Sequence, residues 1–397
     1  MNGLTLMRPD TFEPHPPRVS EPIHVLHTFA NNSSVPYLSW FAERAAREGN
    51  VRYTFLNLYP ERPAMIDEMA ALGFPCEWIP YDDRRRKSGM LRALPRLYAR
   101  IRAHRPRIVH CNLFDDTVPG LIAARLAGIP IRVITRQDTG FHWMHARKWL
   151  FVDRWNARLA TDIITVSDES RRHLIEIEGL PAEKITRVHN GIPPAMHTAR
   201  DPAAMADLRV RFGIEDRAPV IGTVARFIEW KGYRHIVDAA RIIVQRHPDA
   251  RFLLCGSGEQ ESEVRRWVNE AGLQDNVVLT GRIERSLMPS FYGLLDLYLH
   301  AAVLEPFGLV YAEAMMNGVP VVSTATGAAL DAITDGVNGM LAGERGGAAL
   351  AAATERLLAA DRRAIGQAGK ATALRMYAFE AMWNGTMEVY RKALARP

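Results

Sequence analysis

Short apolar runs rich in β-branched residues alternate with longer amphipathic stretches along most of this 397-residue chain. Strands and helices that alternate in this way form βαβ units, and such units build a parallel sheet with helices on both faces. The first half is therefore predicted to be a doubly wound α/β domain. Its expected strands are residues 23–29, 51–58, 76–80, 107–111, 131–135, 162–167 and 184–191.

The alternation breaks once and then begins again. Residues 191–203 are rich in proline and small side chains, which is typical of a linker. Ligands of doubly wound sheets bind at the carboxyl ends of the strands, so two such domains in tandem are expected to bind a ligand in the cleft between them. The strands expected in the second series are residues 219–225, 250–256, 276–281, 295–300, 319–324 and 339–341.

We predict four segments in the chain. Residues 1–21 form a loose tail, 22–195 an N-terminal Rossmann-like domain, and 196–375 a C-terminal Rossmann-like domain. The last segment, residues 376–397, is predicted to be a helix that crosses back to the N-terminal domain.

Composition excludes several classes of protein. Hydrophobic residues make up 48% and charged residues 24% of the chain, which argues against disorder, collagen-like repeats and coiled coils. No apolar run reaches the roughly 18–20 residues that a membrane span needs, and the first 21 residues lack the apolar core of a signal peptide. The three cysteines, Cys76, Cys111 and Cys255, are far apart and fit no metal-ligand spacing. We therefore expect a cytoplasmic protein whose cysteines do not form a metal site.

The positive charge of the chain lies in its first half. Residues 1–200 contain 28 lysines and arginines against 21 acidic residues, whereas the remainder contains 22 against 23. An anionic surface or partner is therefore expected to meet the first half.

Two cations follow the first strand of the second series. Arg226 comes directly after that strand, and Lys231 and Gly232 lie where the next helix is expected to begin. Free N–H groups and the helix dipole add to the charge of these side chains, and together they suit a diphosphate. The alternative is that both cations are solvated on a loop.

Glycine turns and two glutamates complete the pattern. Gly256 and Gly258 either allow close approach of a ligand or simply make a tight turn. Glu305 lies just before the helix expected after Gly308, and Glu313 lies within that helix. Such a helix can offer N–H groups to a phosphate while the loop carboxylate meets sugar hydroxyls. The apolar neighbours of the two glutamates favour specific hydrogen bonding over free exposure to solvent.

In this order and with these spacings, the motifs resemble those of the GT-B glycosyltransferases, and among them the large retaining group called family 4. No single one of these motifs is specific to the family, but six of them in this order and spacing are. The second domain carries the resemblance densely, through Arg226, Lys231-Gly232, the turn 256–259, Glu305 and Glu313, and the segments 318–322 and 335–341. The first domain carries it sparsely, through residues 107–112, 165–170 and 188–192.

The resemblance implies two doubly wound Rossmann-like domains that face each other across a cleft, with residues 22–195 on the acceptor side and residues 196–375 on the nucleotide-sugar donor side. It also implies a reaction that needs neither a cofactor nor a metal. It implies that Arg226 and Lys231 hold the donor diphosphate, that Glu305 binds the transferred sugar, and that Glu313 binds the ribose hydroxyls. The other donor-binding residues that it implies are Gly256, Gly258, Glu259, Arg282, Ile283, Phe307, Gly308 and Leu309.

Two positions depart from the family pattern. The family has a Gly-Gly turn after its first strand, where this chain has Asn31, Asn32 and Ser33, whose backbone and side chains are expected to supply donors on the acceptor side. The family also tends to carry Gly-Gly and a glutamate in the segment 326–336, where this chain has Asp331.

Two further features of the first domain are candidates for the acceptor side. His110 and Asn112 end a strand at the cleft, and His110 is either a catalytic group near neutral pH or a core histidine with satisfied hydrogen bonds. The run 139–145 offers Phe141, His142 and Trp143 as a platform for a sugar, or as packing within the loop.

Residues 84–107 hold ten arginines and lysines and no acid. An apolar helical face there, with Leu91 and Leu97 among its members, is flanked by a row of arginines. A basic amphipathic helix suits an anionic membrane surface or a pyrophosphate-bearing acceptor, and the alternative is a surface helix that packs its leucines on the sheet. Because no nucleic-acid reader motif accompanies this patch, a nucleic-acid partner is not expected.

We therefore expect a retaining, hexosyltransferase-type glycosyltransferase that moves a sugar from a UDP or GDP sugar to an acceptor hydroxyl, in bacterial polysaccharide or glycolipid assembly. Its partners would be a nucleotide-sugar donor and a sugar or lipid-linked acceptor, at the inner face of the plasma membrane. One alternative is an isomerase similar to UDP-sugar 2-epimerase, although the sequence offers no carboxylate pair for it. Another is a catalytically silent sugar-nucleotide-binding partner, which the missing Gly-Gly turn suggests.

Overall fold

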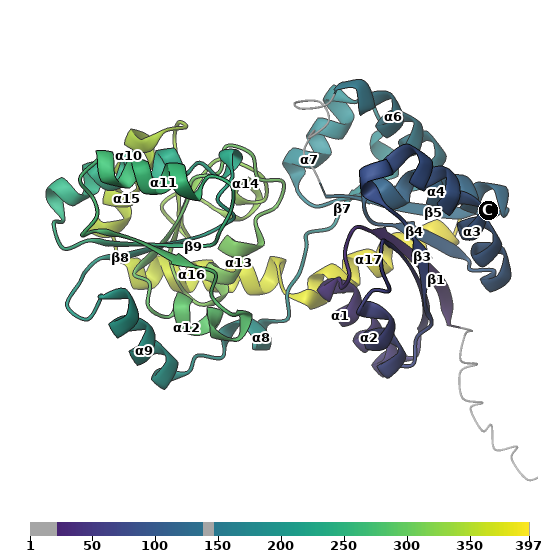
Figure 1. Ribbon diagram of the computed structural model, residues 1–397, viewed down its shortest axis with the longest axis horizontal. Helices are drawn as coiled ribbons and strands as arrows, with labels where there is room; N and C mark the ends of the chain where they lie inside the picture. Colours follow the sequence, from purple (N-terminus) through teal and green to yellow (C-terminus); the bar gives the residue numbers. More distant parts are fainter. Residues whose placement is uncertain (1–21, 138–146, 397) are drawn as a thin grey trace, which may run out of the picture.

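Two parallel sheets, one in each half of the chain, form the framework of the protein (Figure 1). The computed structural model describes residues 22–137 and 147–396, so the predicted tail at 1–21 and the run 139–145, with Phe141, His142 and Trp143, lie outside the described residues. Within the described residues, the predicted two-domain α/β architecture is confirmed.

The first sheet has seven parallel strands in the order β3-β2-β1-β4-β5-β6-β7 among the residues described. The order reverses between β1 and β4, the place where doubly wound sheets bind their ligands. The strands are β1 (Ile23–Ala30), β2 (Val51–Tyr59), β3 (Cys76–Pro80), β4 (Ile108–Cys111), β5 (Ile131–Arg136), β6 (Asp162–Thr165) and β7 (Ile185–Arg187).

Alternate residues of β1 point into two different cores. Val25 and Phe29 pack in one cluster, and Leu26 and Ala30 pack in another on the opposite face of the sheet. Helices α1 (Pro36–Glu48), α2 (Met65–Ala71) and α17 (Phe379–Leu394) contribute to the first cluster or lie beside it. Helices α3 (Arg86–His104), α4 (Phe114–Leu126) and α6 (Leu150–Leu159) cover the other face. Short helices α7 (Asp168–Arg172), α8 (Pro194–Thr198) and α9 (Pro202–Phe212) follow.

Two local features of the first domain differ from what its sequence suggests. Pro36 begins α1, but neither Ser33 nor Ser34 caps that helix. The N-cap residue is Val35, which has no side-chain hydrogen bond, while Ser33 Oγ accepts from the N–H of Ala64 (2.9 Å) and so anchors the loop before α2. In α3, Leu97 is buried as expected, but Leu91 is 72% exposed and does not join the apolar face.

The second sheet has six described strands in the order β10-β9-β8-β11-β12-β13, again all parallel. They are β8 (Val220–Val224), β9 (Arg251–Cys255), β10 (Val277–Gly281), β11 (Leu297–His300), β12 (Val321–Thr324) and β13 (Met340–Ala342). One face is covered by α10 (Tyr233–Arg246), α11 (Glu261–Glu270) and α15 (Gly347–Ala359). The other is covered by α12 (Met288–Tyr292), α13 (Leu309–Met316) and α16 (Arg362–Met376), with α14 (Ala329–Ala332) at the edge.

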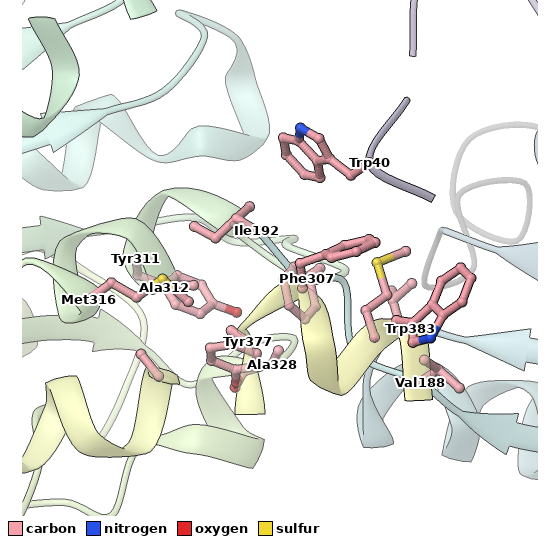
Figure 2. Packing of buried hydrophobic residues seen from close by; sticks show 14 of the residues in the cluster. Trp40, Val188, Ile192, Phe307, Tyr311, Ala312, Met316, Ala328, Tyr377 and Trp383 are labelled. Atoms are coloured by element: carbon pink, nitrogen blue, oxygen red, sulfur yellow. The ribbon is translucent and has the colours of Figure 1, made fainter. Parts of the chain in front are cut away.

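The chain crosses between the domains at two adjacent places. Residues 191–193 lead into the second domain, and residues 377–379 lead back to α17, which packs against the first sheet (Figure 1). The N–H of Ile192 donates to the carbonyl of Tyr377, and the N–H of Phe379 donates to the carbonyl of Ile192, both at 2.9 Å. Figure 2 shows that apolar side chains continue the core through this junction, with Phe307 and Tyr377 between Tyr311 on one side and Trp383 on the other.

No helix among the described residues is long and apolar enough to cross a membrane.

Candidate active site

The loops at the carboxyl edge of the second sheet are joined backbone to backbone. The N–H of Phe227 donates to the carbonyl of Ser257 (3.0 Å), and the N–H of Val303 donates to the carbonyl of Trp230 (2.9 Å). Gly232 has a φ of +70°, and a Cβ placed there would lie 2.0 Å from the carbonyl oxygen of Ala301. Only glycine fits such a contact. The loops that follow β8, β9 and β11 therefore form one block.

Lys231 and Glu305 meet in this block. Lys231 ends the short helix η5 (Glu229–Lys231) after β8, and its Nζ donates to Oε2 of Glu305 in the loop after β11. The Nε2 of His300, the last residue of β11, lies 3.2 Å from the same oxygen. All three side chains are largely buried. The structure thus brings together two residues predicted for the site and adds a third, His300, which the sequence interpretation treated only as part of a strand.

The carboxylate of Glu305 is held in its charged form. Burial raises the pKa of Glu305, but the hydrogen bond and charge of His300 and the charge of Lys231 outweigh it and lower that pKa to about 2. A group with a depressed pKa stabilises the fold above its unfolded pKa, here near 4.5, and loses that contribution as the pH falls through the folded value.

We expect Glu305→Gln to be less stable than the wild type at neutral pH, by about 3 kcal/mol, the size that such a pKa shift carries. This difference should be full above about pH 4.5 and shrink between pH 4.5 and 2. Urea unfolding of both proteins at several pH values in that range measures it. Glu388→Gln, which removes an exposed glutamate of α17 paired only with Lys392, is the control and should show no such trend. A pH-independent difference between Glu305→Gln and wild type would exclude this role of Glu305.

Arg226 lies at the same edge with its side chain exposed. Among the described residues, its guanidinium makes no ion pair, so it is available to an anion. Gly258, Glu259 and Arg282 are also exposed, while Gly256 and Ile283 are half-buried. The N–H of Gly256 donates to the carbonyl of Gly281 (3.0 Å), which joins the loop after β9 to the end of β10.

Glu313 lies on α13 and has different partners from Glu305. Its Oε2 accepts from the hydroxyl of Tyr292 (2.9 Å), and its Oε1 lies 3.5 Å from Nδ1 of His197. Burial raises the pKa of Glu313, while the Tyr292 hydrogen bond and the charge of Arg285 oppose that rise. Arg285 begins the short helix η6 (Arg285–Leu287), two residues after Ile283 of the predicted donor site. The two glutamates therefore occupy separate subsites.

The predicted residues between them have different surroundings. Gly308 is the N-cap of α13 with a φ of +85°, and Leu309 is partly exposed at its first turn. Phe307 is buried, and its ring lies 5.2 Å from that of Tyr377 and 5.9 Å from that of His189. The ring of Phe307 thus packs in the domain junction (Figure 2).

Two carboxylates connect the domains next to the donor loops. Asp331 accepts from the N–H of Asp168 (2.9 Å) and pairs with Nε2 of His189 (2.8 Å). Glu169 of α7 accepts from the N–H of Gly327, and a Cβ on Gly327 would lie 1.8 Å from the carbonyl oxygen of Glu305. Asp331 is therefore directed toward the first domain. These contacts place Glu305 at the junction of the two domains.

The segment in place of the Gly-Gly turn uses its side chains for anchoring. Asn31 has a φ of +63°, a conformation that asparagine tolerates better than most residues. Its Nδ2 donates to Asp115 at the start of α4, and Nδ2 of Asn32 donates weakly to the carbonyl of Ala30 (3.3 Å). With Ser33 bound to the backbone before α2, the side-chain donor of Asn31 is already engaged within the first domain.

His110 is a buried core residue. Its Nδ1 lies 2.6 Å from the hydroxyl of Tyr390 in α17, and its Nε2 lies 2.7 Å from Oγ1 of Thr135. Burial lowers the pKa of His110 to about 3, so the ring is neutral at physiological pH with both nitrogens bonded. This geometry matches the core alternative, and we leave His110 out of the catalytic candidates. The carboxamide of Asn112 is similarly engaged, with Nδ2 donating to the carbonyl of Thr28 (2.8 Å).

A cavity of about 240 Å³ lies beside Asn112 at the carboxyl ends of β4 and β5. Helices α4 and α6 form its other walls. The lining residues are Asn112, Leu113, Phe114, Thr117, Ile134, Thr135, Arg136, Gln137, Asp153 and Asn156. Its mixed lining of polar and apolar side chains suits one hydroxyl-bearing ring.

In the described parts of the chain, no group of three or more histidines, cysteines or acids is arranged to hold a metal ion.

Two family models match the two halves of the chain. The model described as "Glycosyl transferase 4-like domain" matches residues 34–191, and "Glycosyl transferases group 1" matches residues 205–372. These ranges include every described donor-site residue discussed above.

Curated relatives and solved structures agree with these matches. The chain is 31% identical over 249 residues to a 2-deoxystreptamine glucosyltransferase of Streptomyces kanamyceticus, covering 60% of this chain and 64% of that protein. It is 31% identical to a GDP-mannose-dependent phosphatidylinositol monomannoside mannosyltransferase of Mycolicibacterium smegmatis, covering 46% and 51%. The chain thus spans between half and two thirds of the length of these relatives.

The fold as a whole matches known structures more completely. Anabaena HepE in complex with UDP superimposes with a TM-score of 0.78 at 21% identity, covering 93% of this chain and 100% of that one. A sucrose-phosphate synthase of Thermosynechococcus elongatus also has a TM-score of 0.78, at 19% identity, covering 94% and 99%. With both halves matched by glycosyltransferase models, the chain belongs to the group 1 glycosyltransferases (family 4) and has their GT-B fold.

Proposed function

We propose that this chain is a hexosyltransferase that moves a sugar from a nucleoside-diphosphate sugar, with UDP or GDP as the leaving group, to an acceptor hydroxyl. The observation that carries this proposal is the cationic pair at the edge of the second sheet. Lys231 is held in place by Glu305, and Arg226 is exposed beside it. Negative charge develops on the diphosphate as the sugar leaves, and these two cations stabilise that charge.

The proposed reaction retains configuration and needs neither a metal nor a side-chain nucleophile. Two cations already provide the charge that a metal would supply to the diphosphate. His110 is neutral with both nitrogens bonded, which argues against it as the base. We therefore assign the acceptor proton to an oxygen of the leaving phosphate, on the same face of the sugar.

The proposed acceptor is lipid-linked or a growing saccharide, in bacterial polysaccharide or glycolipid assembly. One of the relatives named above is a phosphatidylinositol monomannoside mannosyltransferase and another is a 2-deoxystreptamine glucosyltransferase, so their names do not decide which class of acceptor this chain uses. The basic segment 84–107 favours the lipid. Arg92, Arg96 and Arg102 of α3 are exposed, which supports peripheral attachment to the inner face of an anionic membrane.

The first test is donor binding. Calorimetry with UDP-, GDP- and ADP-sugars, each with and without Mg²⁺, should show binding of one nucleotide class that does not depend on the metal. Product analysis then separates the alternatives. Transfer to an acceptor supports the proposal, a changed sugar without any acceptor indicates an isomerase, and binding without turnover on any acceptor indicates a silent partner. Absence of binding to every nucleotide sugar would overturn the proposal.

We expect Glu313→Ala to weaken donor binding about tenfold or more, because a hydrogen bond to a charged group contributes about 1.5–3 kcal/mol. Calorimetry with the preferred nucleotide sugar measures this change. Glu270→Ala, on the exposed side of α11, is the matched control and should bind normally. Unchanged donor affinity in a folded Glu313→Ala protein would remove the ribose-binding role from Glu313.

A further inference from the structure

The outer side of α6 is apolar and cationic at once. Phe151 is 70% exposed and Trp155 is 42% exposed, although aromatic side chains of this size are usually covered. Arg154 and Arg158 are exposed on the same helix. Residues spaced by three and four positions share one side of a helix, so these four side chains form a single surface, which we call the α6 face.

The α6 face has no acid to neutralise its arginines from within its own helix. Asp153, the one acidic residue of α6, is buried on the opposite side together with Asn156 and Ala157. The first half of the chain also carries the net positive charge of the protein. Arginines that flank exposed aromatic rings are complementary to anionic lipid, since the rings occupy the headgroup boundary while the guanidinium groups pair with phosphates.

We propose that the α6 face docks this protein on an anionic lipid bilayer, with Phe151 and Trp155 inserted at the level of the headgroups. The inference rests on the proposed function, because a lipid-linked acceptor requires the reaction to take place at a membrane. The proposal also assigns the apolar contact with the bilayer to α6, a helix outside the basic segment 84–107.

Helix α3 supplies charge but little apolar contact. Leu97 and Ile101 are buried against the sheet, and Leu91 is the large apolar residue of α3 that is mostly exposed. Helices α3, α4 and α6 cover the same face of the first sheet. Stable attachment to a membrane generally takes two weak signals, here the arginines of α3 and the aromatic rings of α6.

The buried side of α6 lines the cavity at the ends of β4 and β5. Asp153 and Asn156 contribute to its wall. A bilayer on the α6 face would therefore lie about one helix diameter, roughly 10 Å, from the cavity. This distance is short enough for an acceptor headgroup to reach the cavity while its lipid chain stays in the bilayer.

A second copy of the chain fits this surface less well. A two-fold contact between two α6 faces would set Arg154 and Arg158 of one copy against the same residues of the other, and like charges across an interface are unfavourable. A single-stranded nucleic acid also meets arginines and aromatic rings, so it is included in the test.

The test is co-sedimentation of the full chain with vesicles of phosphatidylcholine and phosphatidylglycerol, or of phosphatidylcholine alone. The wild type should bind the mixed vesicles and much less to the neutral ones. Phe151→Ser combined with Trp155→Ser should weaken binding about tenfold or more, because the contact of two large apolar side chains is lost. Val210→Ser, which changes a residue of α9 that is 65% exposed, is the matched control and should bind like the wild type.

The proposal would be overturned if the wild type does not bind the mixed vesicles, or if the double variant binds them as well as the wild type does. It would also be overturned if the double variant loses oligonucleotide binding or self-association but still binds the vesicles. Calorimetry of the donor sugar on the same proteins keeps the two proposals apart. The double variant should bind donor normally. A protein that binds vesicles through α6 but no nucleotide sugar would refute the proposed function and leave the docking surface standing.

Discussion

Replacing Lys231 with alanine is expected to lower turnover about a hundredfold or more, the effect of removing one group that stabilises developing charge. Lys231 is largely buried and held by Glu305, so its ammonium group is fixed before any donor binds. Pre-organised charge of this kind is most effective at the moment when the bond to the leaving diphosphate breaks. Arg226→Ala should show a loss of the same order, since both cations face the same edge of the sheet.

Steady-state kinetics with saturating donor measures this effect. Arg234→Ala is the matched control, because Arg234 is an exposed cation near the start of α10 whose contacts, with Asp238 and the ring of Trp267, lie on α10 and α11 and include no donor-site residue. Thermal unfolding must show that Lys231→Ala remains folded, since the change leaves Glu305 with His300 as its remaining partner. Normal turnover in a folded Lys231→Ala protein would refute the proposed role of the cation.

The second large effect is expected from Gly232→Ala. An alanine at a φ of +70° costs about 1–2 kcal/mol by itself. Its Cβ would also lie 2.0 Å from the carbonyl oxygen of Ala301, and a backbone atom in a packed loop has little freedom to move. We expect a total loss of about 3 kcal/mol or more of unfolding free energy, with Lys231 displaced as well.

The variant Gly272→Ala separates the cost of the positive φ from the cost of the contact with Ala301. Gly272 has nearly the same φ, +68°, but no atom lies within 4 Å of the added Cβ. It should therefore lose about 1–2 kcal/mol and keep its activity. Urea unfolding compares the two variants, and equal losses would show that the contact with Ala301 has no energetic weight.

Much of this architecture could be predicted from the sequence because it depends on local patterns. A buried parallel strand such as β8 is a nearly continuous apolar run, and the glycine that must follow it at position 232 is visible in the chain. The pairing of Lys231 with Glu305 was accessible as well, since both follow strands that are neighbours in the sheet.

Long-range side-chain partners were not predictable in the same way. His300 is an ordinary strand residue in the sequence, and its role depends on the end of β11 lying beside Glu305. His110 looked like a residue at the cleft, but Tyr390, 280 positions later, covers it when α17 returns to the first sheet. Asp331 stands where the family has a glutamate, and only the approach of His189 and Asp168 shows why an aspartate there reaches the other domain. The sequence contained one indication that His110 is covered, because the last helix is long enough to lie across a strand of the first sheet.

The paired crossings at residues 191–193 and 377–379 limit how the two domains can move. Ile192 is bonded on both sides to the returning chain, and a Cβ at Gly191 would lie 2.7 Å from the carbonyl oxygen of Ala378. Sliding or unscrewing one domain against the other would break both hydrogen bonds, whereas a swing about the line through the crossings would keep them. That swing separates Asp331 from His189 and Glu169 from Gly327 together. A hinge rotation about the two crossings is therefore the opening motion that keeps both hydrogen bonds of Ile192.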